Sequence, residues 1–63
     1  MYAIANPIEF GLVVIWTYRT KDNAWYIFDK DRIATYTEEE ANAITQNYPK
    51  AKVIEATQAG NLY

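Results

Sequence analysis

The chain has 63 residues, a net charge of −2 and ten aromatic side chains, but it contains no histidine, cysteine or serine. The absence of these three residue types excludes Ser/His/Asp and Cys/His catalytic sets, and the usual Cys/His zinc sites, within one chain. The length fits a single small domain, residues 1–63, and the mild acidity offers no basic surface for a nucleic-acid backbone.

The first third of the chain favours β-structure. Residues 2–5 are apolar and predict a short strand, which Asn6 and Pro7 end with a turn signal. Residues 8–20 predict a longer strand, because their centre is β-branched and aromatic throughout. Gly11 indicates a bulge or a close backbone approach near the start of this strand.

A second strong strand is predicted over residues 24–28. The polar residues 21–23 between the two β-rich runs are turn-prone, so the runs predict a β-hairpin. Residues 29–32 form another polar turn. Residues 33–36 are either a third strand or an approach segment to the next element.

The clearest local signal is the start of a helix. The sequence from Thr37 to Glu40 matches a capping box, in which the Thr37 hydroxyl accepts the Glu40 amide and the Glu40 carboxylate reaches back. Tyr36 and Ala41 occupy the two positions of a hydrophobic staple.

The predicted helix carries one narrow apolar stripe. Ala41, Ile44 and Tyr48 recur at helical spacing and lie on one side. Pro49 disfavours helical geometry at the preceding residue, so we expect the helix to stop near Asn47.

Residues 53–56 predict a short final strand, and we expect residues 58–63 to be a loose tail. The order of elements predicts an α+β domain in ββ(β)αβ order. Its small antiparallel β-sheet, formed by the hairpin plus short strands, has one α-helix packed on one face.

Both faces of the predicted hairpin carry large apolar side chains. Even-numbered residues from Leu12 to Tyr18 share one face, and Val13, Ile15 and Thr17 share the other. A single helix covers one face of a sheet, so we expect the other to expose a contiguous apolar patch, which usually marks an interaction site. The alternative is that these side chains form the core, with the tail or the first strand wrapped over the second face.

The candidate partner-binding residues combine aromatic rings of the hairpin, as apolar anchors, with charged residues as a polar rim. They are Trp16, Tyr18, Arg19, Lys21, Trp25, Tyr26, Glu38 and Glu39. No catalytic residue, cofactor site or metal site is predicted.

Other chemistries fit the sequence less well. Asp29 and Asp31 could serve acid–base catalysis only if burial or mutual repulsion shifted their pKa values, and the basic neighbours indicate a solvated turn. The spacing that starts at Asp29 resembles a calcium loop, but Ala34 replaces the required glycine. Sheet aromatics could stack on single-stranded nucleic acid, and the acidic groups near the helix start could imitate DNA phosphates. The net charge disfavours the first of these and is weak for the second.

Three segments in the later part of the chain resemble segments found in a class of small proteins. They are Phe28-Asp29, Thr37-Glu38-Glu39-Glu40-Ala41 and Tyr48-Pro49-Lys50-Ala51-Lys52-Val53-Ile54. With them, residues 28–54 resemble the small proteins of bacteriophages and mobile elements that carry a hairpin, a helix opened by a Thr/Ser-Glu-Glu-Ala cap and a closing strand. The resemblance implies a non-enzymatic accessory protein of the anti-CRISPR or anti-defence type.

We therefore expect a non-enzymatic protein-binding module, a phage-encoded inhibitor or adaptor. It would occupy a surface of a larger host protein, such as a CRISPR or other defence nuclease, alone or as a homodimer. The alternative is a small single-stranded nucleic-acid-binding protein that uses sheet aromatics, or a weak acidic DNA mimic.

We expect this protein in the cytoplasm, which is the host cytoplasm if the chain is phage-encoded. The first residues have no basic segment typical of a signal peptide, and the longest apolar run, residues 12–16, is too short to span a membrane. No cofactor and no membrane contact are expected.

Overall fold

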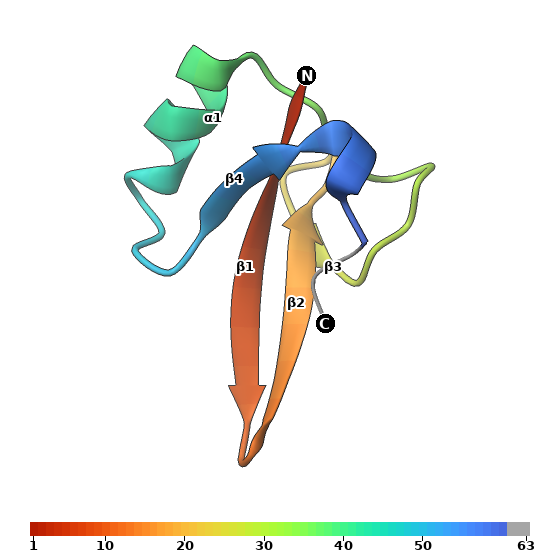
Figure 1. Ribbon diagram of the computed structural model, residues 1–63, viewed down its shortest axis with the longest axis vertical. Coiled ribbons are helices and arrows are strands. Elements are labelled where there is room, and N and C mark those ends of the chain that lie inside the picture. Colours follow the sequence, from red (N-terminus) through yellow and green to blue (C-terminus); the bar gives the residue numbers. More distant parts are fainter. Residues whose placement is uncertain (61–63) are drawn as a thin grey trace.

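The computed structural model describes residues 1–60 and confirms a small α+β fold (Figure 1). A four-stranded antiparallel sheet has the strand order β3-β2-β1-β4, and one helix lies between β3 and β4 in the chain. The elements are β1 (Tyr2–Phe10), β2 (Val13–Arg19), β3 (Trp25–Tyr26), α1 (Glu38–Thr45), β4 (Lys52–Glu55) and the 3-10 helix η1 (Ala56–Gln58). The order ββ(β)αβ is therefore correct.

The principal hairpin is formed by β1 and β2, which differs from the predicted one. The predicted turn at Asn6 and Pro7 is wrong, because both residues lie inside β1. The chain reverses instead at Gly11 and Leu12, where Gly11 has a φ of 59° and Leu12 does not have a positive φ. A positive φ at the first central residue only is typical of a type II′ turn, which suits the twist of a hairpin. The predicted single strand over residues 8–20 is thus divided in two.

The predicted second hairpin exists but is short. The Thr20 amide donates to the Ala24 carbonyl at 2.9 Å, and Asn23 adopts a φ of 63°, which asparagine tolerates in turns. Only Tyr26 and Trp25 then pair with β2. Strand β3 is therefore two residues long rather than the predicted five.

Residues 33–36 are the approach segment rather than a full third strand. Two isolated bridges join this segment to the sheet, one between Thr20 and Ile33 and one between Tyr2 and Tyr36. These bridges bring the chain back across the sheet to the start of α1.

The helix begins as predicted and ends slightly earlier. The Thr37 hydroxyl accepts the Glu40 amide at 3.3 Å, and the Glu40 carboxylate accepts the Thr37 amide at 3.2 Å, so the capping box is confirmed. The last helical residue is Thr45, so Tyr48 lies in the following turn. From there the chain enters β4, which pairs antiparallel with the first residues of β1.

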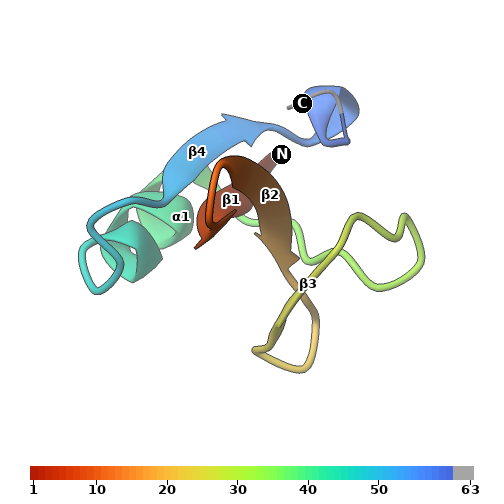
Figure 2. The ribbon, with the colours of Figure 1, turned by 90° about the horizontal axis from the view of Figure 1, so that it is seen from below.

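The core lies at one end of the sheet, where the strands, α1 and η1 come together. Its members are mostly small, so backbones approach closely: Ala3, Ile4, Ala5, Tyr18, Ala34 and Ala41 are buried. Ala3 and Ile4 point to opposite faces of β1, yet both are fully buried, so both faces of the sheet are covered here. Figure 2 looks along the hairpin and shows α1 and η1 on different sides of it.

The tail is described as far as Gly60. Its amide donates to the Tyr18 hydroxyl at 2.9 Å, which connects the end of the described chain to the core. Residues 61–63 of the predicted loose tail lie outside the described residues.

Candidate protein-contact surface

The far half of the β1–β2 hairpin, residues 8–15, is an apolar arm that extends beyond the core (Figure 1). Strand β4 pairs with β1 only as far as Ala5, and β3 pairs with β2 only as far as Tyr18. Beyond these positions the arm has no further strand on either side among residues 1–60. Its exposed apolar side chains are Ile8, Phe10, Leu12, Val13, Val14 and Ile15.

Both faces of the arm are exposed. Ile8 lies opposite Ile15, and Phe10 lies opposite Val13, so these four side chains share one face. Val14 projects from the other face. The expectation of one covered and one uncovered face is therefore wrong. Burial changes along the length of the strands, because the covering elements meet only one end of a long hairpin.

A second apolar group lies beside the arm. Immediately after β3 the chain leaves the sheet at Ile27 and Phe28, and both side chains are exposed to a substantial extent. A pocket of about 280 Å³ opens here, lined by Val14, Ile15, Trp16, Ile27 and Phe28. The Phe28 ring packs edge-on against the Tyr18 ring with centroids 5.5 Å apart, which holds this segment against the core.

Two of the predicted aromatic contact residues are used inside the fold. Tyr18 is only 2% exposed, so its side chain cannot form a contact surface. Trp25 is half-buried and packs edge-on against Tyr48 with centroids 5.0 Å apart. The Arg19 guanidinium carbon lies 5.2 Å from the Trp25 ring and 5.5 Å from the Tyr48 ring. Arg19 therefore acts as part of a stacked cluster, with favourable cation–π geometry.

The remaining predicted residues lie around the core end of the molecule. Trp16 is half-buried beside the Lys52 ammonium, 5.5 Å from its ring centre, and it is the predicted residue nearest the arm. Tyr26 is 47% exposed, with the Arg32 guanidinium 4.9 Å from its ring. Three charged candidates are exposed: Lys21, Glu38 and Glu39.

Sequence reasoning missed the aliphatic residues of the arm, because it searched for aromatic anchors. A usable signal was present. Gly11 and Leu12 form a two-residue link between runs that both favour strands, which is the pattern of a tight hairpin. The proline at position 7 concealed that pattern, although proline is tolerated on an edge strand.

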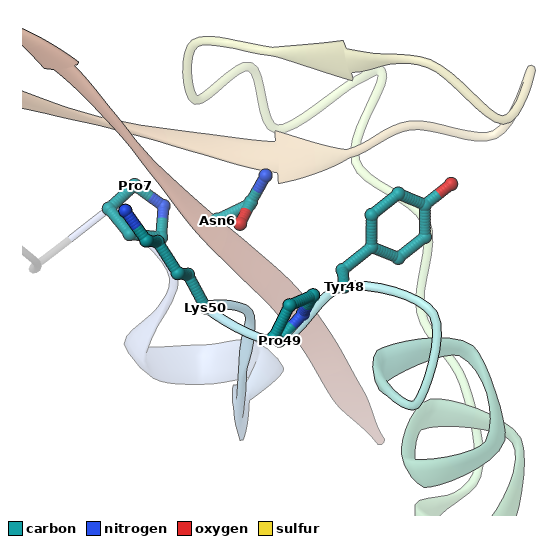
Figure 3. Close-up of a pocket in the computed structure, with 5 residues that line it drawn as sticks. All are labelled: Asn6, Pro7, Tyr48, Pro49 and Lys50. Carbon is teal, nitrogen blue, oxygen red and sulfur yellow. The ribbon is translucent and has the colours of Figure 1, made fainter.

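A smaller pocket lies on the other edge of the hairpin. Its volume is about 240 Å³, and it is lined by Asn6, Pro7, Tyr48, Pro49 and Lys50. Figure 3 shows that Tyr48, Pro49 and Lys50 come from the segment before β4 and approach β1. The Lys50 ammonium also lies 3.7 Å from the Glu9 carboxylate, but both groups are exposed, so this ion pair adds little stability.

The pKa values of Asp22 and Tyr2 are shifted from their ordinary values. The hydrogen bond from the Thr20 hydroxyl lowers the pKa of Asp22 below its ordinary value. The negative charge of Glu55, with a smaller effect of Glu38, raises the pKa of Tyr2. Both groups lie at the core end, and neither belongs to the arm.

Among residues 1–60, no three acidic, histidine or cysteine side chains lie together in a way that could hold a metal ion. No helix in this part of the chain has the length and apolar character needed to cross a membrane.

Comparison of the chain with protein-family models, with curated proteins and with solved structures gave no significant match.

Proposed function

We propose that this chain is a non-enzymatic protein-binding module and that the apolar arm is its principal contact surface. The supporting observation is the exposure of six aliphatic or aromatic side chains on eight consecutive residues of a projecting hairpin. Single exposed apolar residues are ordinary, but a contiguous group is not.

The size of the exposed surface supports a binding role. From the exposed fractions of its side chains, the arm presents on the order of 500 Å² of apolar surface, which is the range of functional patches on monomers. Fully burying one side chain of this kind is worth about 1.5–3 kcal/mol. A partner that covers the arm would recover this free energy, which folding of the single chain leaves unused.

The resemblance of residues 28–54 to phage-encoded accessory proteins suggests the class of partner. We propose a larger host protein, such as a CRISPR or other defence nuclease, which the module would inhibit by occupying part of its surface. Lys21, Glu38 and Glu39 are exposed on the core end and would lie outside the apolar centre of that contact.

The nucleic-acid alternative has less geometric support. Stacking of bases needs accessible ring faces. Tyr18 is buried, and the ring of Trp25 already packs with Arg19 and Tyr48. Trp16 is half-buried with the Lys52 ammonium beside its ring, so Tyr26 is the one exposed ring among the four sheet candidates. One exposed ring is a weak platform for single-stranded nucleic acid.

Site-specific photo-cross-linking tests the proposed function. A benzophenone amino acid replaces Phe10 on the arm or, as a matched control, the exposed residue Asn42 on α1. Each chain is irradiated in a host-cell lysate with and without excess native chain. We expect the Phe10 position to give a covalent adduct with a larger host protein, and excess native chain to reduce its yield. The Asn42 position should give no such adduct.

The adducts also separate the parts of the proposal. An adduct with a defence nuclease supports an inhibitor, whereas an adduct with another host protein retains the binding module and overturns its target class. Equal adducts from both positions, or none from the arm, would overturn the arm as the contact surface.

A further inference from the structure

The outer edge of β2 lacks a neighbouring strand along the arm. Strand β3 would cover this edge if it continued, but it stops after Tyr26, and Ile27 and Phe28 leave the sheet. Within residues 1–60, the stretch from Val13 to Thr17 therefore pairs with β1 alone. A long, apolar and uncovered edge of this kind is a template for another strand.

The backbone groups that face this open edge can be identified. The Thr20 amide donates toward β3, to the Ala24 carbonyl. Because backbone groups alternate along an antiparallel strand, the amides and carbonyls of Trp16 and Val14 point to the same side. On that side, neither residue forms a backbone hydrogen bond with any other residue of 1–60. Two donors and two acceptors are thus available.

The opposite edge of the arm is poorly suited to pairing. Pro7 lies opposite Trp16, so its backbone nitrogen also points outward, and proline has no amide hydrogen to donate. Pro49 and Lys50 lie beside this edge, and Lys50 forms an ion pair with Glu9. Edges protected by proline and charge resist the addition of a strand. Of the two edges of the arm, the β2 edge is therefore the one left open by residues 1–60.

We propose that the occupant of this edge is a second copy of the chain, added antiparallel about a two-fold axis at Ile15. Val14 of each copy then lies opposite Trp16 of the other, which places the free donors against the free acceptors. The inference rests on the proposed function in that both treat the arm as a protein contact.

The sequence of the edge suits pairing with itself. An isologous contact places each residue of the edge against the same edge of the other copy, so like charges would meet and repel. The edge from Leu12 to Tyr18 contains no charged residue. In this register, even-numbered residues of one copy lie opposite even-numbered residues of the other, and odd-numbered opposite odd-numbered. Each apolar face of one arm therefore continues into the matching face of the other.

The proposed register also gives the turn a contact. The turn of one copy, with the fully exposed Leu12, falls beside the point where Ile27 and Phe28 of the other copy leave the sheet. The apolar pocket next to Trp16 opens at that place. Leu12, Ile27 and Phe28 are exposed in the single chain, so this contact would remove part of their apolar surface from water.

Disulfide trapping tests this register, because the native chain has no cysteine. At the axis, the two copies of residue 15 form a non-hydrogen-bonded pair with Cα atoms about 4.5 Å apart, within disulfide range. We expect Ile15→Cys to form a covalent dimer under mild oxidation at least ten times faster than Val13→Cys. Val13 lies on the same face and is more exposed, but its two copies would be about 14 Å apart.

Sedimentation equilibrium provides the second readout. We expect the native chain to have twice the monomer mass, Val14→Pro to be a monomer because it lacks the outward amide, and Val14→Thr to remain a dimer. A native chain that stays monomeric at millimolar concentration, or equal cross-linking at positions 13 and 15, would overturn the inference. A monomer that still gives the arm-specific adduct with a host protein would overturn it without touching the proposed function.

Discussion

At the residue scale, the helix cap shows how much a local pattern can determine. Thr37 and Glu40 satisfy each other's backbone amides, and both partners lie within four residues of sequence. No long-range contact is needed for this geometry, so the sequence alone predicted it correctly.

Removing the cap hydroxyl measures its contribution. We expect Thr37→Ala to lower the free energy of unfolding by about 1 kcal/mol, because the Glu40 amide loses its acceptor. Urea denaturation provides the measurement, and Thr35→Ala, at an exposed position outside the helix, is the matched control. If both variants lose the same free energy, the cap contributes nothing specific.

The Asp22 carboxylate links stability to pH. Its pKa is lowered in the folded chain by the Thr20 hydroxyl, so its contribution is present above the unfolded-state pKa and is lost as pH falls through the folded-state pKa. We expect NMR titration to show that Thr20→Val moves the pKa of Asp22 back toward its ordinary value. A carboxylate that titrates at the same pH in both proteins would contradict this cause.

Trp25 packs inside the fold, although the sequence pattern predicted a role in partner binding. An aromatic residue in a predicted hairpin fits a contact residue, but the structure packs this ring against Tyr48, which is 23 positions away. Such contacts between distant segments cannot be found from local patterns. The same limit applies to Tyr18, whose hydroxyl accepts the Gly60 amide.

Truncation of Trp25 should therefore affect folding. We expect Trp25→Ala to lower the free energy of unfolding by roughly 2 kcal/mol, below the range for a fully buried tryptophan because the ring is half-exposed. Trp25→Phe, which retains a ring for Tyr48, should lose less. Unchanged thermal unfolding in both variants would contradict a role of Trp25 in stability and would favour the predicted role in partner contact.

At the scale of elements, the long hairpin depends on one backbone position. Sequence reasoning assigned Gly11 to a bulge or a close backbone approach, and it placed the turn at Asn6 and Pro7 instead. Pro7 is accommodated instead on an edge that β4 leaves uncovered. Which edge a strand occupies is decided by the whole sheet, so the sequence could not show it.

The chirality of residue 11 tests the turn. We expect Gly11→Ala to lower the free energy of unfolding by about 1 kcal/mol, because an L-residue is strained at a φ of 59°. A chemically synthesised chain with D-alanine at the same position should retain the native stability or exceed it. If L- and D-alanine have equal effects, the turn does not have the geometry described.

At the scale of the whole molecule, the composition and order of elements were sufficient to predict an α+β fold with one helix. They were not sufficient to predict how far each element extends. Strand β3 stops after two residues and β4 after four, whereas β1 continues for nine. This mismatch in length leaves the arm uncovered, and it places the exposed apolar surface at one end instead of on one face.

We propose that the exposed residues of the arm serve contact with another chain and not the stability of the folded monomer. The most direct test is urea unfolding of a Phe10→Thr, Leu12→Asn double variant beside the native chain, at concentrations low enough for both to be monomers. We predict free energies of unfolding within about 0.5 kcal/mol of each other, as for surface substitutions. A loss of more than about 2 kcal/mol would contradict the claim, because it would show that these side chains support the fold itself.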